Sequence, residues 1–314
     1  MEQRRLIVAV AGTVALFLTI QFGALALVEP FQSAGLQAVE NPEDPTNSFL
    51  YIGAILVATG LMLAAFKFDL QWLIRGMVIL ASVLLSWYVL VVVVPPVLTV
   101  GDVHLLAALG ALAIGAGLAV HPEWYVIDAA GVVMGAGAAG LFGITFGILP
   151  ALVLLVVLAV YDAISVYGTK HMLSLADGVM EIKVPVLLIV PVSPDYSFLD
   201  EGESEASDGS TDGDDGEGRD AFFIGLGDAV IPTILIASAA FFVPAPSLEV
   251  PGVALTLPAL GGIVGMLAGL LVLLWMVLQG RAHAGLPLLN GGTIAGYLLG
   301  ALASGLTLTQ AIGL

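Results

Sequence analysis

The sequence predicts an all-α, polytopic membrane protein with nine membrane-spanning helices. Three observations indicate this fold class. Hydrophobic residues make up 59% of the chain and charged residues only 11%, whereas a soluble domain carries about 25% charged residues. The mean hydropathy is +1.07. The apolar residues also fall into stretches of about 20, which is the length that a helix needs to cross a bilayer.

Nine such stretches follow one another along the chain. The first comes after Arg4 and Arg5. Its apolar run is longer than the roughly 7–15 residues of a cleavable signal peptide, so we expect it to remain as a membrane anchor. The nine stretches lie near residues 6–28, 49–66, 72–95, 102–120, 124–144, 147–168, 221–243, 257–279 and 286–312.

The basic residues predict the orientation of these helices, because Lys and Arg collect on the cytoplasmic loops of membrane proteins. With nine spans and the N-terminus in the cytoplasm, all 8 basic residues fall on the cytoplasmic side and the outer loops carry only acids. We therefore expect the C-terminus to lie outside. The basic residues are Arg4, Arg5, Lys67, Arg75, Lys170, Lys183, Arg219 and Arg281.

This topology divides the chain into three parts: residues 1–168 with six helices, a cytoplasmic loop over 169–220, and residues 221–314 with three helices. In the loop, the β-branched run 182–190 predicts a short strand near the membrane surface, although an amphipathic surface segment explains it equally well. Ten of the 25 acids lie between Asp200 and Asp220. Much of the net charge of −17 thus belongs to a tract with the composition of a disordered linker.

Glycines recur at four-residue intervals in three of the predicted helices. This spacing lets helix backbones approach closely in membranes, so we expect these glycines to support a compact bundle. They are Gly131 and Gly135, then Gly261, Gly265 and Gly269, then Gly292, Gly296 and Gly300.

Two aspartates lie inside predicted spans at matching depth. Asp162 comes about six residues before the cytoplasmic end of its helix and Asp228 about seven residues after the start of the next, which is roughly 9–11 Å from the interface. An ionisable residue within a span indicates function by default. Spacing alone leaves open a catalytic pair, an ion-binding pair and a structural pair. Asp128 lies near the start of its helix and can reach the interface, so we interpret it as structural and leave its function open.

The residues around the two aspartates resemble the presenilin and signal-peptide-peptidase family of intramembrane aspartyl proteases. The resemblance covers nine spans, two short motifs and the hydrophilic segment between them. The orientation is similar to that of presenilins, and the size resembles archaeal or other prokaryotic members. The resemblance implies a catalytic pair, Asp162 and Asp228, with supporting or substrate-binding residues Tyr161, Gly225, Leu226 and Gly227, in the motifs Tyr161-Asp162 and Gly225-Leu226-Gly227-Asp228.

The family's third motif is Pro-Ala-Leu at the start of the ninth helix. This chain departs from it, since Pro287, Leu288 and Leu289 stand there instead. Literal Pro-Ala-Leu begins at Pro150 and at Pro258, but both lie at the predicted outer side. We therefore expect residues 287–289 to be the equivalent segment beside the aspartates.

The chemistry that the resemblance implies is hydrolysis of transmembrane peptide substrates in the lipid bilayer. Two carboxyl groups that share one proton supply a general base to activate water and a general acid to protonate the substrate. An unwound substrate would dock by β-augmentation, either on the run 182–190 or on irregular backbone around Pro287. We expect no metal, no cofactor and no nucleic-acid partner, and we leave the oligomeric state and accessory subunits open.

The main alternative is a transporter or channel that binds cations or protons at paired intramembrane aspartates. That function predicts internal repeats and further polar residues along a path. The chain has no convincing repeat, and its last two predicted helices are nearly free of charge. With 0 cysteines, the chain also cannot carry a thiolate nucleophile. The sequence therefore favours the protease.

Overall fold

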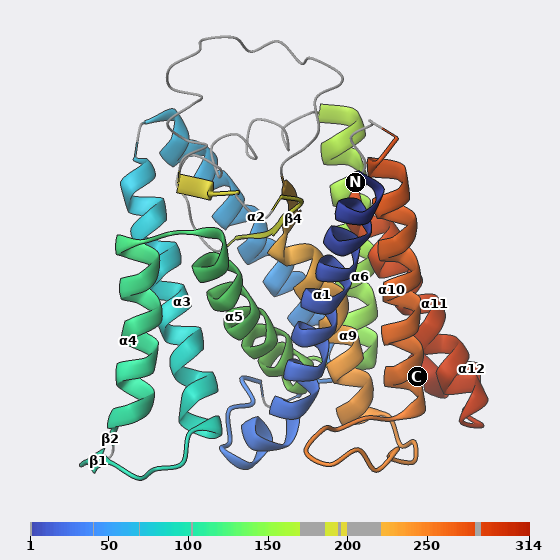
Figure 1. Ribbon diagram of the computed structural model, residues 1–314. Coiled ribbons are helices and arrows are strands. Elements are labelled where there is room, and N and C mark those ends of the chain that lie inside the picture. The colour runs from blue at the N-terminus through green and yellow to red at the C-terminus, as the bar shows by residue number, and fades with distance from the viewer. Residues whose placement is uncertain are drawn as a thin grey trace.

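The computed structural model describes residues 2–39, 41–68, 70–101, 103–169, 186–193, 196–199, 221–279 and 284–314. Each of the nine predicted apolar stretches contains one long helix within these residues (Figure 1). The long helices are α1 (Glu2–Ser33), α2 (Thr46–Lys67), α3 (Gln71–Val93), α4 (Leu105–Val120), α5 (Trp124–Thr145), α6 (Ile148–Ile164), α9 (Leu226–Phe242), α10 (Leu257–Val277) and α11 (Gly285–Ala303).

The remaining described elements are short. A π-helical turn, η1 (Ser165–Thr169), continues α6, and α12 (Leu308–Ala311) lies near the C-terminus. Strands β1 (Thr99–Val100) and β2 (Val103–His104) form a small hairpin before α4, and strands β3 (Leu187–Pro191) and β4 (Ala221–Gly225) form a second antiparallel pair.

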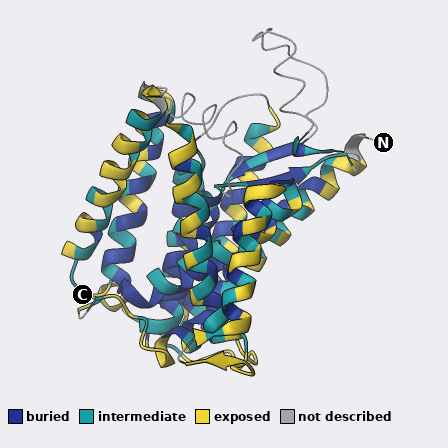
Figure 2. Ribbon diagram, turned by 90° about the vertical axis from the view of Figure 1, so that its left-hand side faces the viewer, coloured by how far each residue is buried: buried dark blue, intermediate teal, exposed yellow. Residues whose placement is uncertain are grey.

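The described helices have the lengths and the surface of an integral, multi-pass membrane protein. Seven of them are long and apolar enough to cross a bilayer, and two further apolar helices, α4 and α9, are shorter. Large apolar side chains cover the outside, such as Val57, Leu84 and Trp275, each of which is at least half exposed. Exposed residues follow the outer faces of the helices in Figure 2. A surface of this kind is stable against lipid and not against water.

Helix α9 lies at the centre of the bundle. It contacts α1, α5, α6, α10 and α11 (Figure 1). Helices α3 and α4 pack together at one side of the bundle, and α10 and α11 pack together at the other. Every residue of α9 from Pro232 to Ala239 is buried, whereas Val230 and Ile231, just before them, are partly exposed. Helix α9 is therefore enclosed over most of its length, and Asp228 lies in the turn before the buried stretch.

Glycines bring the last two long helices into backbone contact, as their spacing predicts. A Cβ atom added to Gly261 or Gly265 of α10 would collide with the carbonyl group of Gly296 or Gly292 of α11. The glycines of α5 have a different neighbour. Gly135 faces the side chains of Leu226 and Val230 on α9. Small residues thus bring α10 close to α11 and α5 close to α9.

The strand pair β3–β4 changes one predicted helix boundary. The stretch 221–243 was expected to be helical throughout, but residues Ala221–Gly225 form β4 and α9 begins at Leu226. Phe222, Phe223 and Ile224 are aromatic or β-branched residues, which favour strands, and Gly225 weakens a helix. The expected strand over 182–190 is found from Leu187 onward, and residues 182–185 lie outside the described residues.

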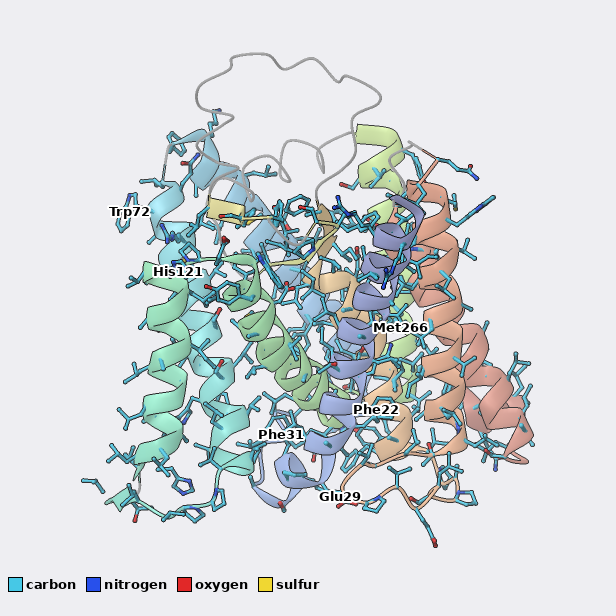
Figure 3. All side chains as sticks on the ribbon, viewed as in Figure 1. Phe22, Glu29, Phe31, Trp72, His121 and Met266 are labelled. Carbon is cyan, nitrogen blue, oxygen red and sulfur yellow. The ribbon has the colours of Figure 1, made fainter. Side chains whose placement is uncertain are left out.

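The sheet marks one end of the bundle. The N-terminus lies toward this end, and the C-terminus lies toward the other (Figure 1). Trp72 and His121 lie toward the end with the sheet, whereas Glu29 lies at the opposite end (Figure 3). The start of α11 also lies at the end with the sheet (Figure 1).

Candidate active site

Asp162 lies near the end of α6, where the α-helix gives way to the π-helical turn η1. Only 5% of the residue is exposed. Its Oδ2 atom accepts a hydrogen bond of 3.1 Å from the backbone N–H of Leu286, in the first turn of α11. Because a buried carboxyl group needs such partners, the start of α11 fixes the orientation of Asp162.

Asp228 lies in the first turn of α9, directly after the strand β4. It is partly exposed. Two glycines face its carboxyl group: a Cβ atom on Gly285 would lie 2.9 Å from Oδ2, and one on Gly225 would lie 3.5 Å from the same atom. The absence of a side chain at Gly285 therefore leaves the space that the carboxyl group occupies.

The position that the sequence predicted for Asp228 within its helix is wrong. The residue is the third of α9 and not about the seventh, because β4 takes up the first part of the apolar stretch. Asp162 and Asp228 nevertheless meet at one end of the bundle. Leu286 binds the carboxyl group of Asp162, and the neighbouring residue Gly285 lies against the carboxyl group of Asp228.

Directly after Gly285 and Leu286 comes the segment 287–289, which we expect to correspond to the family's third motif. Pro287, Leu288 and Leu289 lie in the first two turns of α11. Leu289 is fully buried. The carbonyl oxygen of Leu288 faces Gly269 of α10, where a Cβ atom would collide with it. These residues therefore pack the start of α11 against α10 and place the preceding Gly285 and Leu286 beside the aspartates.

The other expected site residues differ in their exposure and in their contacts. Tyr161 is 40% exposed, and within the described residues its hydroxyl group forms no hydrogen bond to either aspartate. Leu226 is buried and packs against Gly131 and Gly135 of α5. Gly227 is exposed. A direct role for these residues remains a prediction.

Sequence reasoning missed two polar contacts that hold α11 in place. The hydroxyl group of Tyr167, in η1, accepts a hydrogen bond of 3.2 Å from the N–H of Ala284. The side-chain amide of Asn290 donates a hydrogen bond of 2.9 Å to the carbonyl oxygen of Leu155 on α6. Asn290 is fully buried. A buried amide within an apolar stretch is a signal that could have identified Asn290, whereas the role of Tyr167 depends on the π-helical turn.

Two acids of the α5 region bind the segment around β3. The Oδ1 atom of Asp128 accepts a hydrogen bond of 2.8 Å from the N–H of Ile189. Glu123, directly before α5, accepts one of 3.0 Å from the N–H of Phe198. Both acids are 7% exposed. In the described part of the chain, no group of three His, Asp or Glu residues is arranged to hold a metal ion.

Comparisons with known proteins identify the family. The model of the family described as signal-peptide peptidase, presenilin aspartyl protease matches residues 14–306. A solved structure of a presenilin family intramembrane aspartate protease, in space group C222, is 33% identical and matches with a TM-score of 0.66 over 94% of this chain and 99% of that chain. A second such structure, in space group P2, is 34% identical, with a TM-score of 0.63 over 93% and 97% of the two chains.

The search of curated proteins gave no match. The family model and the solved structures that match the chain describe proteases, and they give the alternative transporter function no support. A bundle of apolar helices, which the described residues form, is the architecture that an intramembrane protease needs. The chain therefore belongs to the signal-peptide peptidase and presenilin family of intramembrane aspartyl proteases.

Proposed function

We propose that Asp162 and Asp228 are the catalytic pair of this protease. The observation that carries the proposal is the contact of both carboxyl groups with one short segment, since Leu286 donates to Asp162 and Gly285 lies against Asp228. Three helices that are distant in the sequence thus supply two acids and the backbone between them. Acids that served only to stabilise the bundle would need no such shared contact.

The pair would hydrolyse the peptide bond with water as the nucleophile. One ionised carboxyl group takes a proton from water, and the resulting hydroxide attacks the carbonyl carbon. The protonated partner gives its proton to the carbonyl oxygen, which yields a tetrahedral diol. The C–N bond then breaks. The leaving nitrogen takes the proton that the first carboxyl group received from water, and a diol hydroxyl group gives its proton back to the second carboxyl group. Because two such carboxyl groups titrate as a unit, neither aspartate is assigned the role of the base.

The substrate would be a transmembrane helix that unwinds locally and adds to the sheet as a strand. The edge strand β4 supports this mode, because it ends at Gly225, three residues before Asp228. An extended segment paired with β4 would pass directly in front of the catalytic pair. The exposed Gly227 leaves room for the backbone of that segment.

The topology that we propose has nine spans, with the N-terminus in the cytoplasm and the C-terminus outside. Residues 1–168 would hold six spans, 169–220 the cytoplasmic loop and 221–314 the last three spans. The 17 residues of α9 extend over about 26 Å, which is shorter than the roughly 30 Å of a bilayer core. The sheet would therefore enter the cytoplasmic side of the membrane, where water reaches Asp228.

A cleavage assay tests the catalytic pair. The purified protein in detergent is incubated with a single-span model substrate, and the products are identified by mass spectrometry. Wild type should cut within the apolar segment, and both Asp162→Ala and Asp228→Ala should abolish cleavage. Asp44→Ala, on a loop between α1 and α2, is the matched control and should leave cleavage unchanged. Cleavage by either catalytic variant would refute the proposal.

A further inference from the structure

The strand β3 is bound on both of its edges, and a side chain occupies the outer one. Its inner edge pairs with β4 in the register that joins Leu187 to Gly225 and Pro191 to Ala221. On the outer edge, the N–H of Ile189 donates to Oδ1 of Asp128, on α5. Helix α5 and strand β3 also pack against each other. Asp128 thus takes the place that a third strand would otherwise fill.

The register determines which edges remain open. Hydrogen-bonded and non-bonded pairs alternate in an antiparallel ladder. Leu226 donates across the ladder to Val186, whereas Ile189 donates away from it. Phe223, which lies opposite Ile189, therefore points its N–H and C=O toward the outer edge of β4. Within the described residues, no hydrogen bond to this edge of Phe223 is present.

A cavity lies beside the Asp128 contact. Its volume is about 270 Å³, and its lining includes Thr19 from α1, Trp124 and Asp128 from α5, and Ile189 from β3. Without Asp128, the N–H of Ile189 would face this space with no protein partner. An unpaired strand edge next to a cavity is free to shift its register or to pair with another segment.

We propose that Asp128 is a positioning residue of the protease. Asp128 binds the outer edge of β3 and holds the β3–β4 pair in one register. The outer edge of β4 then remains open as the docking edge for substrate. This inference rests on the proposed function, in which substrate adds to β4. The path to the catalytic pair is short, because Ile189 lies opposite Phe223, and β4 continues through Gly225 into the helix turn with Asp228. A slip of one residue would turn every side chain of β4 to the opposite face.

The test compares Asp128→Ala, which removes the acceptor, with Asp128→Asn, which keeps a carbonyl oxygen at the same place. Ser82→Ala is the matched control, because it deletes another buried polar side chain, which bonds to Val78 of α3 and Met134 of α5 and does not bind the sheet. For each variant, kcat and KM are measured on the single-span substrate, and the ends of the products are determined by mass spectrometry. Hydrogen exchange of the peptide that contains Ile189 is measured without substrate.

We expect Asp128→Ala to lower kcat about tenfold, with little change in KM. A misplacement of catalytic groups by about 1 Å costs roughly a hundredfold in rate, so tenfold corresponds to a shift of about half an ångström. Its cleavage sites should spread to neighbouring bonds, and the Ile189 amide should exchange faster. Asp128→Asn should restore all three properties. If Asp128→Ala does not fold, Asp128→Ser, which is too short to reach Ile189, replaces it.

Unchanged exchange at Ile189, or unchanged product ends in Asp128→Ala, would overturn the inference. Equal impairment of Asp128→Asn would also overturn it, because the acceptor would then not be the relevant group. Failure of the proposed function has a different signature, which is cleavage that persists in Asp162→Ala or Asp228→Ala. The exchange measurement needs no cleavage, so it separates the two outcomes.

Discussion

Replacing Gly285 with alanine should impair catalysis while the fold is kept. The added Cβ atom would lie 2.9 Å from Oδ2 of Asp228, whereas ordinary contacts of a Cβ atom begin at 3.4 Å. The carboxyl group must therefore move by about half an ångström. Since a misplacement of about 1 Å costs roughly a hundredfold in rate, we expect kcat to fall about tenfold. This corresponds to about 1.4 kcal/mol of transition-state stabilisation.

The stability of this variant should change little. Gly285 is the first residue of α11, and alanine is a better helix former than glycine by about 1 kcal/mol. Gly291→Ala is the matched control, because it makes the same change in the same helix at a position with nothing within 4 Å. The assay is the rate of cleavage of a single-span substrate, with thermal unfolding in detergent measured in parallel.

The result that would refute this reasoning is a Gly285→Ala variant with a kcat within about twofold of wild type. The carboxyl group of Asp228 would then tolerate the displacement, or it would not lie where the peptide bond is cut. A variant that is inactive because it is unfolded would point to an effect on packing, and the melting temperature distinguishes this case. If Gly291→Ala also lost activity, the cause would be the helix and not the contact with Asp228.

Two further predictions concern the contacts that place α11. Gly265→Val should destabilise the protein by about 1–3 kcal/mol through overpacking, because the valine side chain would collide with the carbonyl group of Gly292. Thermal unfolding checks this prediction, and Gly60→Val, at a position with nothing within 4 Å, is the control. Asn290→Ala removes the hydrogen bond to Leu155 and should destabilise the protein by about 0.6 kcal/mol, the average for interhelical hydrogen bonds in membranes, and by no more than about 1.7 kcal/mol. An unchanged melting temperature in either variant would contradict the role assigned to its contact.

The sequence was sufficient to predict the helices and the approximate position of the acids. In the part of the chain that the structure describes, each of the nine apolar stretches overlaps one long helix, because hydropathy over about 20 residues reports the apolar length of a helix. The spacing of Gly261 and Gly265 predicted the backbone contact between α10 and α11, since glycine leaves a groove on whichever face carries it. These features depend on local composition, and local composition is what a sequence displays.

The start of α9 and the partners of the acids could not be predicted in the same way. Residues Ala221–Gly225 are as apolar as a spanning helix. Their side chains favour a strand only weakly, and the pairing with β3 decides the outcome. That pairing joins segments on either side of the acidic tract, so no local pattern reports it. The contact of Gly285 with Asp228 is likewise set by the packing of α11 against α10. Long-range contacts of this kind follow from the tertiary structure alone.

The location of the two acids follows from opposing demands on an enzyme within a membrane. Hydrolysis needs water, whereas the bilayer core excludes it, and irregular backbone is tolerated there only where protein covers it or water reaches it. Both acids lie where a helix meets other structure: Asp162 precedes the π-helical turn, and Asp228 follows β4. The first turn of a helix leaves N–H groups without helical partners. The N–H of Leu286, at the start of α11, uses this property to bind Asp162. The irregular backbone that would admit water and substrate therefore also supplies the donor that orients the acid.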